Sequence, residues 1–174
     1  LFFDYWFSGR DLYVSFGYGE YHVFTYVSEK DYRSIMLYFP HSLVEIFCEK
    51  VYDHCREFSG YDTLIDVGST VGEFIAYSLV KGFRRERIFS VEPFSFITVR
   101  RRGRLINTHF KTVITDPGTF RNLIDLSVGR TLLKIDCEGC EKHLSIEDLT
   151  SLGKGSTAVI EYHPWTMDKM REDF

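Results

Sequence analysis

The chain has 174 residues, the length of one domain, and 44% of them are hydrophobic. Aromatic residues alone make up 17%, which is enough for a packed core and argues against wholesale disorder. The net charge of -4 indicates no particular class of partner, and no uncharged apolar run approaches the roughly 18 residues that a membrane-spanning helix needs.

The N-terminal stretch "LFFDYWFSGRD" has no basic residues ahead of its apolar ones, so it does not predict a signal peptide. We therefore expect a cytoplasmic protein without a membrane span. In that compartment the four cysteines, Cys48, Cys55, Cys137 and Cys140, are expected to be reduced thiols.

Residues 1–60 predict a hairpin followed by a helix, packed on the rest of the chain. "DLYVSFGYGEYHVFTYV" alternates apolar and polar residues on both sides of "GYG", which is typical of a hairpin. Residues 41–58 repeat apolar side chains, including Cys48 and Cys55, at helical spacing. Ser42 and Glu45 form a capping-box pattern that predicts the start of this helix.

Residues 61–174 alternate strands with helices, which predicts an α/β fold. The expected strands are 63–67, 87–91, 111–115, 131–136 and 157–162, and the expected helices are 72–81, 94–106 and 117–127, with a weaker turn or helix at 143–152. Such alternation predicts a Rossmann-like, doubly wound and mostly parallel sheet with right-handed crossovers.

The stretch "DTLIDVGSTVGEF" places Asp66 inside an apolar strand and Gly68 and Gly72 just after it. Glycine allows a ligand to approach a strand-to-helix turn closely, although an ordinary turn would also explain both glycines. The spacing differs from G-x-G-x-x-G, and Asp66 suits a cationic ligand group better than a pyrophosphate.

"IFSVEPF" places Glu92 at the end of the next strand, followed by Pro93. An acid in that position can accept both hydroxyls of a ribose. An amino group near Asp66 and a ribose on Glu92 together describe S-adenosylmethionine.

"TLLKIDCEGCEKHL" ends a third strand with several charged residues, Lys134, Asp136, Glu138 and Glu141. Burying charges at the end of a central strand is costly unless they are paired or used. A solvated strand terminus is the simpler alternative.

Together, "LIDVGSTVGEF", "FSVEPF", "LLKIDCEGCE" and "VIEYH" resemble the FkbM-type methyltransferases over residues 62–163. That family consists of class I S-adenosylmethionine-dependent enzymes, mostly O-methyltransferases. The resemblance implies that Asp66, Gly68 and Gly72 hold the methionine portion, Glu92 holds the ribose, and Asp136 lies near the transferring methyl. The usual Ala-Asn pair after the first glycine is Ser69-Thr70 here, which alters a polar contact. The expected cofactor-binding residues are Asp66, Gly68, Ser69, Thr70, Gly72, Glu92, Pro93 and Asp136.

The expected catalytic residues are Asp136, Glu138 and His163. His163 is a candidate general base, with a hydrogen-bonded histidine at the rim as the alternative. Carboxylates such as Asp136 and Glu138 suit a divalent ion, but the pattern does not predict a metal site. Cys137 and Cys140 lack the second cysteine pair that a zinc site would need.

The expected activity is methyl transfer to a small hydroxylated metabolite, sugar or lipid. Eight basic residues between 81 and 104 raise the alternative of a nucleic-acid methyltransferase, although a solvated helix face explains them more simply. A binding protein that keeps the fold without catalysis is the second alternative.

Overall fold

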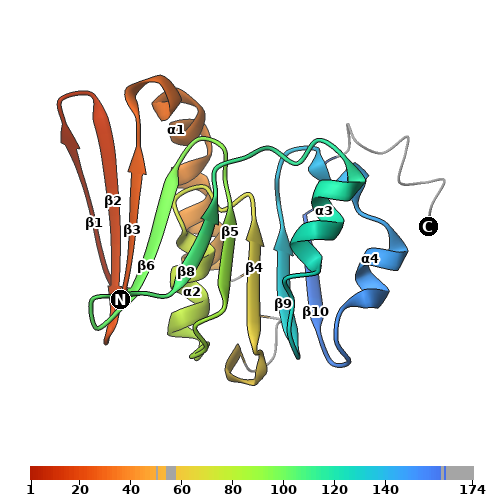
Figure 1. The fold of residues 1–174 in the computed structure, drawn as a ribbon. Coiled ribbons are helices and arrows are strands. Elements are labelled where there is room, and N and C mark those ends of the chain that lie inside the picture. The colour runs from red at the N-terminus through yellow and green to blue at the C-terminus, as the bar shows by residue number, and fades with distance from the viewer. Residues whose placement is uncertain (50, 54–57, 162, 164–174) are drawn as a thin grey trace.

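The computed structural model describes residues 1–49, 51–53, 58–161 and 163. Within them the chain forms two five-stranded sheets and the α-helices that pack against them (Figure 1). None of the helices described is long and apolar enough to cross a membrane.

The first sheet is antiparallel and contains the predicted hairpin. Its order is β1-β2-β3-β6-β7, with bounds β1 (Phe2–Ser8), β2 (Asp11–Tyr18), β3 (Tyr21–Val27), β6 (Phe96–Arg101) and β7 (Arg104–Leu105). The hairpin of β2 and β3 is confirmed, and β1 adds an edge strand.

The predicted helix at 94–106 is wrong, because β6 and β7 occupy that stretch. β6 pairs with β3, and its β-branched residues Ile97 and Val99 point into the core. Gly103 has a φ of +82° and supplies the tight turn into β7. The proposed division after residue 60 stays a prediction, with β6 joining the sheet of the N-terminal hairpin.

The second sheet is parallel in all its neighbouring pairs, as predicted. Its order is β10-β9-β4-β5-β8, with bounds β4 (Thr63–Val67), β5 (Ile88–Val91), β8 (Asn107–Phe110), β9 (Thr131–Ile135) and β10 (Thr157–Ile160). The chain starts at β4 in the centre, runs outward through β5 to β8, and then returns to β9 on the other side. This order is compatible with a Rossmann-like fold and puts the topological switch between β4 and β9. The strand predicted at 111–115 lies at 107–110 instead.

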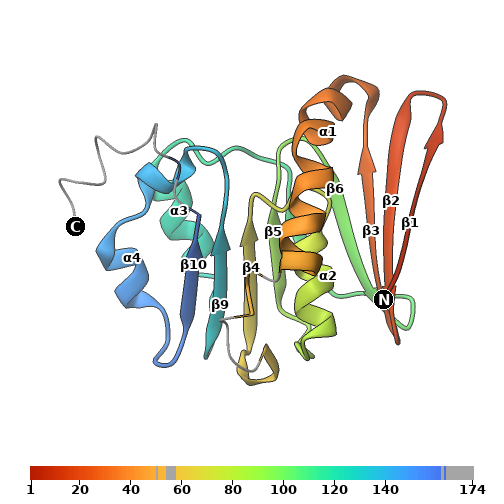
Figure 2. The same cartoon turned by 180° about the vertical axis from the view of Figure 1, so that it is seen from behind.

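Helices cover both faces of this parallel sheet (Figures 1 and 2). Their bounds are α1 (Glu29–Leu43), α2 (Glu73–Val80), α3 (Pro117–Ile124) and α4 (Ile146–Ser151), with a π-helical continuation of α1 at Val44–Glu49 and short 3-10 turns at Phe58–Gly60 and Cys140–His143. Leu64 of β4 packs on the α1 and α2 side, whereas the next residue, Ile65, packs on the α3 side.

The first helix begins at Glu29, earlier than the capping-box pattern predicts. Pro40 lies inside α1, and Ser42 is therefore a helical residue and not a cap. The Ser42 hydroxyl donates hydrogen bonds to the Phe39 carbonyl and to the Glu73 carboxylate. Parts of the predicted helix, including Cys55, lie outside the described residues.

Candidate functional site

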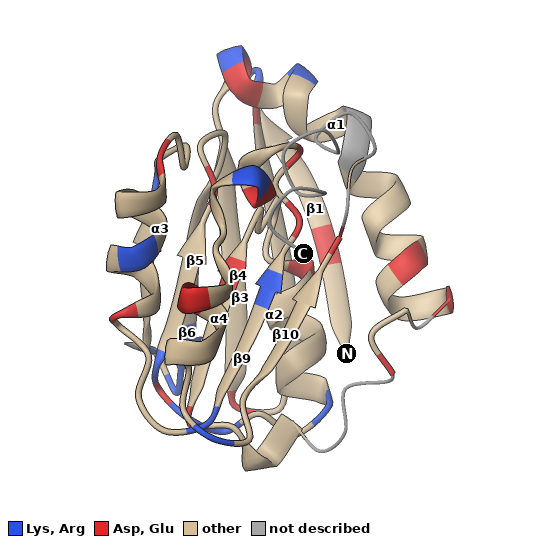
Figure 3. Ribbon diagram, turned by 90° about the vertical axis from the view of Figure 1, so that its right-hand side faces the viewer, with Lys and Arg blue, Asp and Glu red and all other residues tan. Residues whose placement is uncertain are grey.

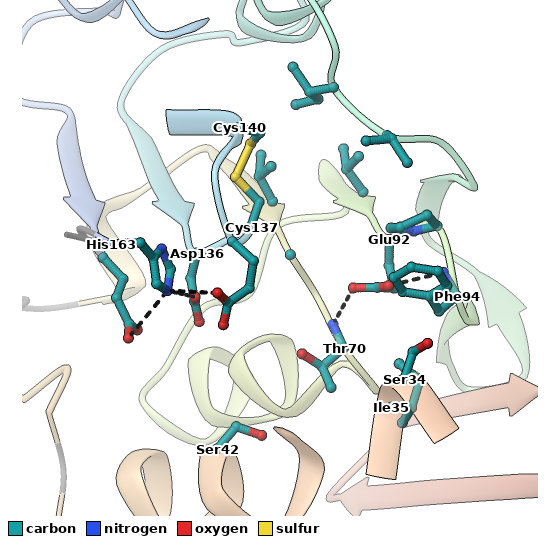
Figure 4. Close-up of a pocket in the computed structure, with 18 of the residues that line it drawn as sticks. Ser34, Ile35, Ser42, Thr70, Glu92, Phe94, Asp136, Cys137, Cys140 and His163 are labelled. Atoms are coloured by element: carbon teal, nitrogen blue, oxygen red, sulfur yellow. Dashed lines mark hydrogen bonds and ion pairs between the residues drawn. A yellow bond between two sulfur atoms is a disulfide. The ribbon is translucent and has the colours of Figure 1, made fainter. Parts of the chain in front are cut away.

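A cavity of about 370 Å³ opens at the carboxyl ends of the parallel strands. Gly68 and Thr70 follow β4, Glu92 follows β5, Asp136 follows β9, and His163 follows β10, and all five line the cavity. Figure 4 shows His163 and Asp136 at one end of it and Glu92 at the other, with residues of α1 on a facing wall. Ligand sites of doubly wound sheets lie at this edge.

The structure brings together most of the predicted site residues, but not all of them. Pro93 and Glu138 also line the cavity. Asp66, Ser69 and Gly72 do not line it: Asp66 lies within β4, and Ser69 and Gly72 lie in the turn between β4 and α2.

Both glycines of the turn are required by packing within the protein. Gly68 has a φ of +76°, and a Cβ there would lie 1.6 Å from the Asp136 carbonyl oxygen. Gly72 has a φ of +85°, and a Cβ there would lie 2.8 Å from a methyl group of Val23 in the antiparallel sheet. Gly68 therefore brings the end of β4 against β9, and Gly72 brings the start of α2 against the other sheet.

The backbone N–H groups of the turn are already bonded within the protein. A turn that cradles phosphate would instead direct them at its ligand. Two of their acceptors are carboxylates, which would repel a phosphate. The bonds run from Gly68 and Ser69 to the Val91 carbonyl, from Thr70 to Glu92, from Val71 to Glu73, and from Gly72 to the Ser69 carbonyl.

Glu92 is buried at the wall of the cavity, with 5% of its surface exposed. Burial raises the pKa of Glu92 to about 7, although the N–H groups of Phe94 and Thr70 oppose that shift. Each carboxylate oxygen accepts one of these N–H groups at 3.0 Å. Each oxygen keeps a lone pair for one further donor, so the group can accept two hydroxyls.

Thr70, which donates one of these bonds, has a φ of +46°. This left-handed conformation is strained for a β-branched residue, and strain of this kind concentrates at functional sites.

Asp66 is fully buried and faces Lys134 instead of the cavity. Its carboxylate lies 3.6 Å from the Lys134 ammonium and accepts no hydrogen bond from the residues described. Burial raises the pKa of Asp66 to about 7, with Lys134 opposing the shift. The Lys134 ammonium donates to the Gly68 carbonyl at 2.7 Å and lies 3.2 Å from Asp136 Oδ2. Lys134 thus links the turn, Asp66 and Asp136 behind the cavity.

The three predicted catalytic residues meet at one end of the cavity. His163 Nε2 lies 3.5 Å from a Glu138 oxygen, 3.9 Å from Asp136 Oδ1 and 4.0 Å from Glu161 Oε1. Burial lowers the pKa of His163, but the hydrogen bond to Glu141 and the charges of Glu138, Glu141 and Asp136 outweigh it, so the net shift is upward.

Glu141 is the site residue to which the sequence reasoning gave no role. It is fully buried and lies 2.8 Å from His163 Nδ1. It also accepts the backbone N–H groups of Gly139 at 2.7 Å and Cys137 at 3.4 Å. In the sequence, Glu141 is visible only as an acid directly after the second cysteine of "CEGC". Its contact with His163, 22 residues later, is seen only in the fold.

The same loop is closed by a disulfide between Cys137 and Cys140. The predicted reduced state is therefore wrong for this pair. Cys48 is a free thiol, but it is exposed and not a core residue. It lies in the π-helical stretch Val44–Glu49, which does not keep the α-helical spacing that the prediction used.

Most of the basic residues between 81 and 104 pair with acids of the same chain. Arg101 and Arg102 bind Glu20, and Arg104 lies near Glu86. Similar pairs join Lys81 to Asp53 and Arg85 to Asp62. Figure 3 marks Lys and Arg positions in blue and Asp and Glu positions in red along the ribbon, and both kinds occur on the side that it shows.

Comparison with protein-family models, curated proteins and solved structures finds no match to this chain. The geometry of the cavity is therefore the basis for assigning a function.

Proposed function

We propose that this protein is an S-adenosylmethionine-dependent methyltransferase of the Rossmann-like class I fold. Its acceptor is a small hydroxylated metabolite, sugar or lipid, and the methyl group goes to oxygen. The order and direction of the parallel strands and the position of the cavity at their carboxyl ends support this fold.

The charge of the cavity carries the proposal. Its lining includes five carboxylates and, among the residues described, no Lys or Arg. The five are Glu45, Glu92, Asp136, Glu138 and Glu161. A pyrophosphate would be repelled here, whereas the sulfonium and ammonium groups of S-adenosylmethionine are attracted. The turn after β4 also disfavours a dinucleotide, because its N–H groups are already bonded within the protein and are not directed at a phosphate.

The cavity offers a place for each part of this cofactor. Glu92 can accept the two ribose hydroxyls, and Phe94 and Ile114 are apolar residues of the same cavity lining, against which the base would pack. The methionine portion would lie toward Gly68 and Asp136. When bound, the cofactor supplies an electrophilic methyl group.

The protein must orient the acceptor hydroxyl and remove its proton. Asp136, Glu138 and His163 lie together near the position of the methyl group, with Glu161 beside His163. A positioned acid–base group contributes roughly 100-fold or more to such a reaction.

A nucleic-acid acceptor is disfavoured because most of the basic residues between 81 and 104 are paired with acids of the same chain. Among the described residues that line the cavity there is no Lys or Arg that would hold a phosphate.

Methyl transfer to a panel of hydroxylated metabolites, sugars and lipids tests the proposal, with S-adenosylhomocysteine detected by mass spectrometry. On any acceptor found, Asp136→Asn should lower turnover by about 100-fold or more. Glu147→Gln, which neutralises an exposed acid on α4, is the matched control and should not change it. Turnover of Asp136→Asn at the parent rate would contradict the assignment.

A further inference from the structure

The ends of β9 and β10 bring three potential metal ligands together. An oxygen of Asp136, an oxygen of Glu161 and a nitrogen of His163 all lie within 4.8 Å of one another. Figure 4 shows Asp136 and His163 side by side at one end of the cavity. Three ligands spaced evenly around one ion lie about 3.6 to 3.8 Å apart, given bonds of about 2.1 to 2.2 Å, and His163 Nε2 lies 3.9 Å from Asp136 Oδ1 and 4.0 Å from Glu161 Oε1. Movements of a few tenths of an ångström would therefore bring all three into coordination.

The backbone holds Asp136 and Glu161 in place. The Asp136 N–H donates to the Val67 carbonyl at 2.9 Å, and the Glu161 N–H donates to the Ile135 carbonyl at 2.8 Å. The ligand-bearing residues therefore extend directly from the hydrogen-bonded ladder of the parallel sheet. Sites built on such rigid elements hold their geometry more precisely than sites on loops.

His163 is oriented by a carboxylate on its other nitrogen. Nδ1 lies 2.8 Å from the fully buried Glu141, so Nδ1 carries the proton and donates it to that oxygen. In the neutral ring this tautomer leaves the lone pair on Nε2, the nitrogen near Asp136, Glu138 and Glu161. Histidines that bind metals almost always have such a partner, which fixes the ring and raises its basicity.

The local charge favours a cation. Lys134 lies on the Oδ2 side of Asp136, whereas Oδ1 faces His163. Glu138 adds a further carboxylate, 3.5 Å from Nε2. The Lys134 ammonium carries one positive charge and does not neutralise all of these carboxylates. Clustered carboxylates at a partly buried site lower the stability of the fold unless a cation is bound.

We propose that Asp136, Glu161 and His163 bind a divalent cation of the Mn²⁺ type, with Glu138 as an additional oxygen ligand. Carboxylate oxygens suit Mg²⁺ and Mn²⁺, and the imidazole nitrogen favours the transition metal of the two. The role of the ion rests on the proposed function: next to the bound cofactor it would lower the pKa of the acceptor hydroxyl. The binding of the ion does not depend on that function.

Electron paramagnetic resonance tests the site with Mn²⁺ alone, on full-length protein treated with chelator and without cofactor. Binding removes the signal of free Mn²⁺, and we expect one ion per chain. Glu161→Gln and His163→Gln should each weaken binding at least tenfold. Glu141→Gln should weaken it by about 10- to 100-fold, as expected for a partner of a metal-bound histidine.

Glu147→Gln is the matched control, since it removes the same charge from an exposed acid outside the cluster. Its affinity should equal that of the parent. Circular dichroism and melting temperature show whether each variant is folded, and Glu161→Gln, at an exposed position, carries the test if His163→Gln does not fold.

Absence of Mn²⁺ binding up to about 1 mM would overturn the proposal. Equal Mn²⁺ affinities of the Glu161→Gln and Glu147→Gln variants would also overturn it. Binding of S-adenosylhomocysteine is measured separately. Binding of Mn²⁺ without binding of this nucleoside would support the metal site and contradict the proposed function. Binding of the nucleoside without binding of Mn²⁺ would support the proposed function and contradict the metal site.

Discussion

Replacing Asp66 by Asn tests whether this carboxylate is a buried charge behind the cavity. The substitution keeps the shape of the side chain and removes its charge. Asp66 is fully buried, its oxygens accept no hydrogen bond from the residues described, and Lys134 retains Asp136 as a partner. The variant should therefore fold, and it should be more stable than the parent at neutral pH.

The size of the gain follows from the pKa of Asp66, which folding raises from 3.8 to about 7. A carboxyl with a raised pKa favours the folded state fully below its unfolded pKa, and this contribution is lost as pH rises to the folded value. At about 1.4 kcal/mol per pKa unit, ionised Asp66 costs about 4 kcal/mol above pH 7. At pH 5 the cost is about 1 to 2 kcal/mol.

Urea unfolding, followed by circular dichroism between pH 4 and pH 8, measures this difference. The stability advantage of Asp66→Asn should be near zero at pH 4 and should grow to about 4 kcal/mol at pH 8. Asp125→Asn, at an exposed position on the surface, should follow the parent at every pH. Equal pH dependence in Asp66→Asn and the parent, or a variant less stable at pH 8, would refute the reasoning.

Three further predictions use other features of the site. Glu92→Ala should weaken S-adenosylhomocysteine binding at least tenfold, because two charge-assisted hydrogen bonds are lost; unchanged affinity in calorimetry would remove Glu92 from the site. Replacing both Cys137 and Cys140 by Ser removes the disulfide and should lower the free energy of unfolding by about 2 kcal/mol and the melting temperature by about 4 to 8 °C. A reductant should lower the melting temperature of the parent and leave that of the variant unchanged. Thr70→Asn should raise stability by about 1 kcal/mol, because Asn tolerates a positive φ better; a loss in urea unfolding would show that the threonine is not strained.

The parallel sheet could be predicted because its strands carry a local signal. The run at 63–67 is buried at every position and ends at a glycine, and the structure places β4 at these bounds. The run at 131–136 gives β9 in the same way. Short apolar runs of this kind, separated by helical patterns, are typical of strands covered on both faces.

The stretch from 94 to 106 could not be predicted from local pattern. Its strand character comes from pairing with β3, about 70 residues earlier in the chain, and tertiary pairing of this kind overrides local propensity. The start of α1 was missed because Pro40 indicates a helix boundary, whereas here it lies inside the helix.

The candidate site was predictable in its residues but not in its contacts. Glu92 and Asp136 were visible as acids at strand ends, and both line the cavity. The partnership of Glu141 with His163 depends on how the 3-10 turn Cys140–His143 brings Glu141 toward the end of β10. The burial of Asp66 against Lys134 depends on which face of the sheet each side chain takes. The resemblance to the FkbM-type enzymes stays a prediction.

Isothermal titration calorimetry with S-adenosylhomocysteine, and with NAD as the comparison ligand, tests the central claim most directly. The acidic cavity and the occupied N–H groups of the turn predict saturable binding of S-adenosylhomocysteine in the micromolar range, about -8 kcal/mol, and no comparable heat with NAD. Saturable binding of NAD without any response to S-adenosylhomocysteine would contradict it.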